Sequence, residues 1–97
     1  KLGGLGMAFV SPALAGRKPQ PGSEEIARAW RPYIDACIEA FGPARCMFES
    51  NFPPDAASCS YRTLWNAFKR IAAGYSAGER TALFSGTAHR VYRLAAN

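Results

Sequence analysis

Hydrophobic residues recur at helical spacing after a stretch rich in proline and glycine, and they predict a first helix from Ser23 to Phe41. Ser23 is expected to cap its N-terminus, because a serine hydroxyl can accept a hydrogen bond from a free backbone N–H of the first turn. Pro32 is expected to kink this helix or to start a second one, and Gly42-Pro43 ends it. The apolar positions of the helix are Ile26, Trp30, Tyr33, Ile34, Cys37, Ile38 and Phe41.

The same periodicity predicts two further helices in the C-terminal half of the chain. One runs over about residues 60–73, and its buried stripe is Tyr61, Leu64, Trp65, Phe68, Ile71 and Ala72. Ser76 and Glu79 then match a capping box, in which each side chain accepts a hydrogen bond from the free backbone N–H of the other residue. The helix that follows is expected to break at Gly86 and to restart after Thr87.

Two short segments, residues 1–7 and 45–50, are typical of β-strands. Alternation in the second places one set of side chains on each side: Met47, Glu49 and Asn51, opposite Cys46, Phe48 and Ser50. Loop 8–22 separates the first strand from the first helix, and loops of this length are often functional. The order strand, helix, strand predicts an α/β fold in which the two strands run parallel.

Two parallel strands offer too little sheet for three helices to cover. Stripe residues such as Trp30 and Trp65 would then have no sheet to pack on. We therefore expect residues 1–97, which begin with Lys1 and not with methionine, to be the C-terminal piece of something larger. By themselves they are expected to be inactive and poorly soluble, because half of the apolar stripes lack partners.

Composition and charge exclude several classes of protein. The chain has 48% hydrophobic and 20% charged residues, which is ordinary for a globular domain, and it has no apolar run long enough to cross a membrane. Its net charge of +5 is dispersed over several predicted helices, which argues against a nucleic-acid partner. The cysteines, Cys37, Cys46 and Cys59, are odd in number and lack CxxC spacing, so a reducing, cytoplasmic setting is expected.

Residues 41–53, FGPARCMFESNFP, resemble the last barrel strand of the amidohydrolase superfamily, and more closely that of its amidohydrolase-related, lactonase-like hydrolases. Residues 79–94 are similar to the closing helices of that family, and residues 1–5 to its preceding strand. The resemblance implies that residues 1–97 are the C-terminal portion of a (β/α)8 TIM barrel, with two parallel strands and flanking helices. Such barrels carry their chemistry at the C-terminal ends of the strands.

The resemblance also implies a site at the end of the second strand. The position of Asn51 is usually an aspartate that binds a divalent metal or relays a proton from the attacking water. An amide can only ligate weakly or hydrogen-bond substrate, so a metal in the parent protein is in doubt and the cofactor stays unknown. Glu49 replaces a usual glycine and adds a carboxylate on the same side. We predict catalytic roles for both; the alternatives are that Asn51 caps the following loop and that Glu49 pairs with a residue outside this chain.

Three further residues are candidates for substrate binding. Phe9 and Arg17 lie in loop 8–22, which is expected to line the mouth of the site or else to be an exposed linker. Asp55 could replace the missing carboxylate, although a solvated turn aspartate is typical after two prolines. His89 is expected at the surface, and Cys59 lacks a nearby base that would make it a nucleophile.

These residues predict a hydrolase that opens a lactone, amide or related carboxyl-derived small molecule by attack of water. A related lyase, such as a decarboxylase, and a binding protein that has lost catalysis are the alternatives. The expected partner is a small-molecule substrate, without nucleic acid or membrane, and self-association into a homo-oligomer is left open.

Overall fold

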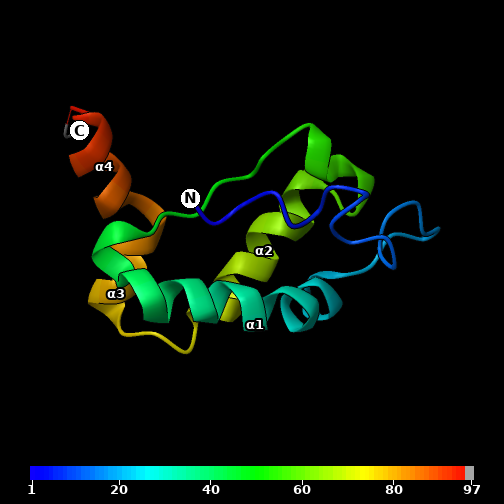
Figure 1. Cartoon of the computed structure of the whole chain (residues 1–97), viewed down its shortest axis with the longest axis horizontal. Coiled ribbons are helices and arrows are strands. Elements are labelled where there is room, and N and C mark those ends of the chain that lie inside the picture. Colours follow the sequence, from blue (N-terminus) through cyan, green and yellow to red (C-terminus); the bar gives the residue numbers. More distant parts are fainter. Residues whose placement is uncertain (96–97) are drawn as a thin grey trace.

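The computed structural model describes residues 1–95, and helices dominate it (Figure 1). The α-helices are α1 (Ser23–Phe41), α2 (Tyr61–Ala72), α3 (Ala77–Thr81) and α4 (Thr87–Tyr92). They are joined by two 3-10 turns, η1 (Pro43–Arg45) and η2 (Pro54–Ala57), and by a π-helical turn, η3 (Ala82–Gly86). Loop 8–22 projects at the end of the molecule opposite α4 (Figure 1). Within residues 1–95, each helix is too short or too polar to cross a lipid bilayer.

The predicted α/β class is wrong for this structure. Helical residues make up 57% of it and strand residues 2%, and residues 1–95 contain no sheet, so it does not show the two parallel strands with flanking helices of a (β/α)8 barrel. The predicted strands at 1–7 and 45–50 are reduced to one isolated parallel bridge between Leu2 and Phe48. Leu2 donates its N–H to Met47 (2.7 Å) and accepts from the N–H of Glu49 (3.3 Å).

The strands fail to extend because their backbone groups bond elsewhere. Phe48 donates its N–H to the carbonyl of Leu83 in η3 (3.0 Å), so a helical turn takes the place of a neighbouring strand. Gly4 has φ = 90° and Asn51 has φ = 50°, and these left-handed conformations end the extended course of both segments. Alternation alone could not reveal these competing bonds.

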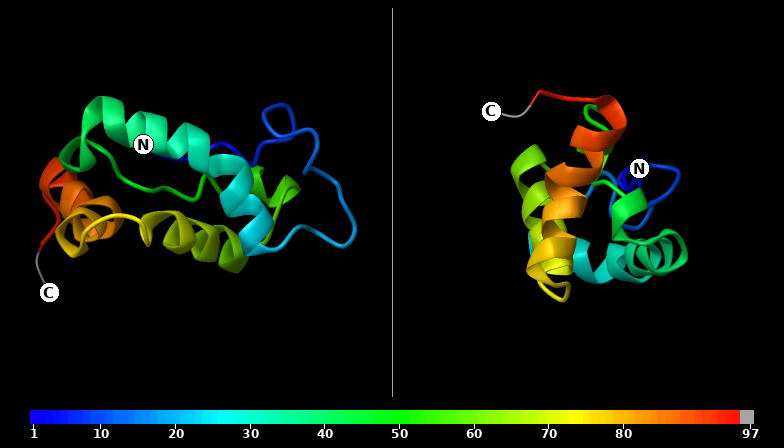
Figure 2. Two further views of the ribbon diagram at one scale, coloured as in Figure 1. Left: turned by 90° about the horizontal axis from the view of Figure 1, so that it is seen from below. Right: turned by 90° about the vertical axis from the view of Figure 1, so that its left-hand side faces the viewer.

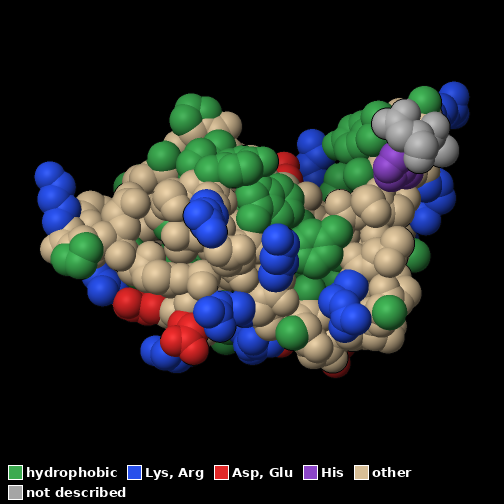
Figure 3. Space-filling model, turned by 180° about the vertical axis from the view of Figure 1, so that it is seen from behind, with side chains coloured by type: hydrophobic (Ala, Val, Ile, Leu, Met, Phe, Trp, Pro, Cys, Tyr) green, Lys and Arg blue, Asp and Glu red, His purple; other side chains and the backbone are tan. Residues whose placement is uncertain are grey.

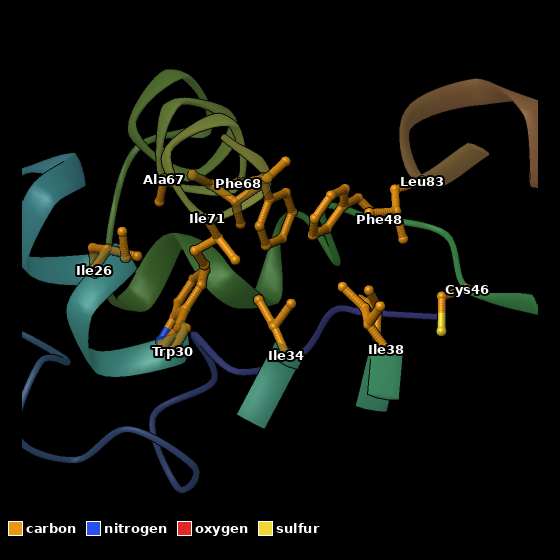
Figure 4. Packing of buried hydrophobic residues seen from close by; sticks show 14 of the residues in the cluster. Ile26, Trp30, Ile34, Ile38, Cys46, Phe48, Ala67, Phe68, Ile71 and Leu83 are labelled. Carbon is orange, nitrogen blue, oxygen red and sulfur yellow. The ribbon is translucent and has the colours of Figure 1, made fainter. Parts of the chain in front are cut away.

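α1 and α2 lie side by side, and the two extended segments run across one side of the pair (Figures 1 and 2). The buried positions of α1 face those of α2: the rings of Trp30 and Phe68 are 6.0 Å apart, and Phe48 stacks on Phe68 at 4.5 Å. Figure 4 shows Ile34 of α1 and Leu83 of η3 pointing into the same cluster. Most residues of the predicted stripes are therefore buried by packing on one another and not on a sheet. The predicted burial of Tyr61 is wrong, since it is 55% exposed, and Tyr33 and Phe41 of the first helix are also exposed.

The local signals of the helices are mostly confirmed. Ser76 and Glu79 form the expected capping box at the start of α3. α1 spans the predicted residues and continues through Pro32, but its N-cap is Gly22, without a side-chain cap. Ser23 lies inside the helix and accepts a hydrogen bond from Nε of Arg70 (2.8 Å).

The predicted break at Gly86 is absent from the described helices. α3, η3 and α4 follow one another without interruption, and Gly86 has helical φ and ψ. A π-helical turn accommodates the irregularity there, and π-turns inside helices often mark functional or strained positions. α4 ends at Arg93, which adopts a left-handed conformation.

Lys and Arg side chains are scattered over the face seen in Figure 3, and several hydrogen-bond the fold itself. Arg31 donates to the carbonyls of Ile71 (3.4 Å) and Arg70 (3.3 Å) at the C-terminal end of α2, where the carbonyl of Ile71 also accepts the N–H of Gly74 (3.5 Å). This part of the positive charge is therefore used to cap a helix.

Candidate functional site

The polar residues that follow the bridge form one connected network between the segments 1–6 and 48–58. Asp55 is 1% exposed, and its Oδ2 accepts the backbone N–H of Gly6 at 3.1 Å. Its Oδ1 accepts Nδ2 of Asn51 at 2.7 Å. Ser58, also buried, donates its hydroxyl to the carbonyl of Gly6 at 2.6 Å. The network therefore ties two segments that lie about fifty residues apart in the sequence.

Glycines let the two segments approach this closely. A Cβ on Gly3 would lie 2.2 Å from Cγ of Glu49, and one on Gly6 would lie 3.0 Å from both Cβ and Cγ of Asp55. A methyl group at Gly3 would overlap Glu49, so a glycine is required there unless the glutamate moves. The side chains of Glu49 and Asp55 thus lie directly against the backbone of the N-terminal segment.

Asn51 is placed by its own backbone and by Asp55. Its left-handed φ of 50° is a conformation that asparagine tolerates better than most residues. Its carbonyl accepts the N–H of Asp55 (3.0 Å), which starts the turn into η2. The predicted loop-capping role is therefore present, and a catalytic role stays a prediction. Among residues 1–95, nothing donates a hydrogen bond to its side-chain oxygen, Oδ1.

Glu49 is half-buried beside Gly3, and no Lys, Arg or His among residues 1–95 lies within ion-pair distance of its carboxylate. Its charge still acts on Lys1: the pKa of that ammonium is raised, first by a hydrogen bond and charge interaction with Tyr92 and then by Glu49. A carboxylate without a bonded partner is free to accept a proton. Its catalytic role stays a prediction.

Phe9 and Arg17 are not drawn into this network. Phe9 is 77% exposed, and Arg17 forms an ion pair with Glu25 in the first turn of α1. That pairing raises the pKa of Arg17 and lowers the pKa of Glu25. Loop 8–22 nevertheless contacts η2, since the N–H of Gly16 bonds the carbonyl of Ala57 at 3.0 Å. The loop is therefore attached beside the network, and substrate binding by Phe9 and Arg17 stays a prediction.

Asp55 is buried, so the expectation of a solvated turn aspartate is wrong. Two prolines before it indicated a turn, but nothing local indicated the N–H of Gly6 across the fold. Ser58 was missed for the same reason, because a serine between an alanine and a cysteine carries no signal of its distant partner. Burial, and then the charge of Asp55, raise the pKa of Cys59 to about 11, so its thiol is a poor nucleophile.

The donor set here does not by itself make a divalent-metal site. Both oxygens of Asp55 already accept hydrogen bonds, which leaves the neutral oxygen of Asn51 and the carboxylate of Glu49 as the available ligand groups. Residues 1–95 contain no group of three or more His, Cys, Asp or Glu that could hold a metal ion. Divalent metals prefer several charged oxygen or imidazole ligands, so no step is assigned to a metal bound by these residues alone.

Comparison with known proteins decides the family. A family model described as Amidohydrolase matches residues 3–94. The chain belongs to the amidohydrolase family. The resemblance read from residues 41–53 and 79–94 is therefore confirmed, and this amidohydrolase chain carries the Asn51–Asp55 network inside the matched region.

Two curated relatives are similar to part of this amidohydrolase chain. An uncharacterized protein, y4mH, from Sinorhizobium fredii (strain NBRC 101917 / NGR234) is 52% identical over 64 residues, which cover 66% of this chain and 22% of that protein. An L-fucono-1,5-lactonase from Burkholderia multivorans (strain ATCC 17616 / 249) is 44% identical over 62 residues, or 63% of this chain and 21% of the lactonase. The match thus spans about a fifth of each relative. No solved structure matches the chain significantly.

Proposed function

We propose that the protein hydrolyses a lactone, or a related amide or carboxyl-derived small molecule, with Glu49 as general base and Asn51 as a positioning amide. One observation carries the proposal. Consecutive glycines lie beneath the two side chains, since Cγ of Glu49 approaches Gly3 and Nδ2 of Asn51 lies 3.7 Å from the place of a Cβ on Gly4. The carboxylate of Glu49, which has no ion-pair partner among residues 1–95, and the amide of Asn51 therefore both lie against the glycine segment at the end of the bridge.

In the proposed reaction the carboxylate of Glu49 takes a proton from water as the water oxygen attacks the carbonyl carbon. The ring C–O bond then breaks, and the proton passes to the leaving oxygen, which gives a hydroxy acid. Oδ1 of Asn51 accepts a hydrogen bond from the water or from a substrate hydroxyl and so orients the attack. The carbonyl substrate class is supported by family membership and by the printed activity of the lactonase relative.

The experiment is an assay of the intact protein against a panel of lactones, monitored by acid release at constant pH, and against simple amides, monitored by release of ammonia. Glu49→Gln should lower kcat by about a hundredfold, the range expected for loss of a general base. Asn51→Ala should lower kcat/KM by about tenfold, since one orienting hydrogen bond is lost. Asp35→Asn is the matched control, because Asp35 lies on α1 and bonds the hydroxyl of Tyr75. Equal turnover by all three variants would show that Glu49 and Asn51 have no role in catalysis.

A binding protein without catalysis is the second candidate, and the amide at position 51 favours it. A neutral Asn51 cannot take a proton from water, whereas the aspartate usual in the resembling family can. Saturable binding of a lactone, measured by calorimetry, without any acid release over hours would favour this candidate. A cytoplasmic setting and self-association stay predictions for either function.

A further inference from the structure

We infer that Asp55 is a positioning residue that fixes the amide of Asn51 with its oxygen turned toward the ligand. The presence of a ligand at this position rests on the proposed function, whereas the orientation of the amide rests only on the hydrogen bonds of Asp55. It changes the role predicted for Asp55, from touching substrate to acting through Asn51.

The chemistry of a carboxylate determines which way the amide of Asn51 points. An ionised aspartate only accepts hydrogen bonds, so the group of Asn51 that faces it must be the donor, Nδ2. Oδ1 is then directed away from Asp55 and stays available to a ligand. A neutral partner that both donates and accepts could not impose this choice.

Asp55 can impose the orientation because it is itself held firmly. Its Oδ2 is bonded to the N–H of Gly6, a backbone donor that cannot rotate, and its own N–H donates to the carbonyl of Asn51. Its carbonyl accepts the N–H of Ser58 at 3.1 Å. With 1% exposure, the carboxylate is shielded from water that could replace these partners.

The decisive variant is Asp55→Asn, which keeps the shape of the side chain but replaces one acceptor by a donor. The backbone N–H of Gly6 cannot turn, so the remaining oxygen at position 55 must face it. The new NH2 group then faces Asn51, whose amide must rotate to present Oδ1 inward and Nδ2 outward. The ligand would meet a donor where the unsubstituted protein presents an acceptor.

The rescue is the exchange of the two side chains, Asn51→Asp with Asp55→Asn. The new carboxylate at position 51 accepts from the new amide at position 55, and its second oxygen faces the ligand as an acceptor again. Asn51→Asp alone is not a rescue, because it sets two carboxylates against each other. Asp35→Asn is the control for the chemical change itself.

The first readout is hydrogen exchange of the side-chain NH2 of Asn51 in the intact protein, followed by NMR and assigned by its loss in Asn51→Asp. In the unsubstituted protein this group should exchange slowly, and Asp55→Asn should accelerate it by at least about tenfold. The second readout is kcat/KM, which should fall by about tenfold in Asp55→Asn and return to within about threefold in the exchanged pair.

Each outcome decides the inference. Unchanged amide exchange in Asp55→Asn would overturn it, whereas rapid exchange together with rescue by the exchanged pair would support it. If Asp55→Asn does not fold but the exchanged pair does, the complementarity of the pair is supported. If neither folds, the unsubstituted protein decides, because fast exchange of its Asn51 amide overturns the inference and slow exchange supports it. If the Asn51 amide exchanges slowly but the protein hydrolyses no substrate, the proposed function is overturned and the orientation of the amide is still supported.

Discussion

The hydroxyl of Tyr75, in the turn after α2, donates a 2.7 Å hydrogen bond to Oδ1 of Asp35 in the middle of α1. This contact ties α1 to the turn that follows α2 and complements the apolar packing of the two helices. Burial, and then the hydrogen bond and charge of Asp35, raise the pKa of Tyr75 to about 12. The contact is absent from any local sequence pattern, since the two residues are forty positions apart.

Tyr75 should make stability depend on pH in the alkaline range. The folded protein holds the phenol proton more tightly than the unfolded chain, whose tyrosine pKa is about 10. The contribution is therefore complete below about pH 10 and is lost as the pH rises through about 12. Tyr75→Phe should cost about 1 kcal/mol at neutral pH and reduce the alkaline loss, as measured by urea unfolding at several pH values. Identical pH profiles for the two proteins would contradict the assignment.

Gly6→Ala should destabilise the protein and loosen the site together. The added methyl group would lie 3.0 Å from the side chain of buried Asp55, which is closer than side chains normally approach. We expect a loss of about 1–3 kcal/mol in the free energy of unfolding, measured by denaturant titration. Gly78→Ala is the control, because nothing lies within 4 Å of that position in helix α3, and it should stabilise by about 0.5–1 kcal/mol. Equal changes in the free energy of unfolding for both variants would contradict the close approach of Asp55 to Gly6.

Phe48→Ala should be among the most destabilising core changes. Phe48 is buried, stacks on Phe68 and lies 4.8 Å from the ring of Phe84. Truncation of a buried phenylalanine costs about 3–5 kcal/mol, measurable as a shift of the urea midpoint. Phe41→Ala is the matched control: Phe41 is 56% exposed at the end of α1 and should change stability by less than about 1 kcal/mol. A small effect at position 48 would mean that the extended segment does not pack as described.

The thiols should differ sharply in reactivity. Burial is the main cause that raises the pKa of Cys46, and it raises the pKa of Cys59 to about 11, so both resist alkylation near neutral pH. Cys37 is exposed, although its place in the apolar stripe predicted otherwise. Iodoacetamide followed by mass spectrometry should label Cys37 rapidly in the native protein, and Cys37→Ser should abolish the fast phase. Rapid labelling of Cys59 would show that its site opens readily.

Sequence patterns predicted the helices well because their causes are local. The spacing of Ile34 and Ile38, the capping pair of Ser76 and Glu79, and the stop at Gly42 depend on neighbours within one or two turns. The family resemblance could also be found from the sequence, because it lies in contiguous segments such as residues 41–53. Asn51 was also singled out from its place at the end of an apolar segment, and its functional role stays a prediction.

The sequence could not predict the features that depend on hydrogen-bond partners far along the chain. Two alternating segments predicted strands, but the N–H of Phe48 bonds a helical turn and so the pairing stops at one bridge. Asp55 read as a solvated turn residue and is buried, because its partner Gly6 is 49 positions away. Local propensity thus determined where the helices lie. The tertiary structure decided the strands and the burial of Asp55, since these depend on hydrogen-bond partners that only folding brings near.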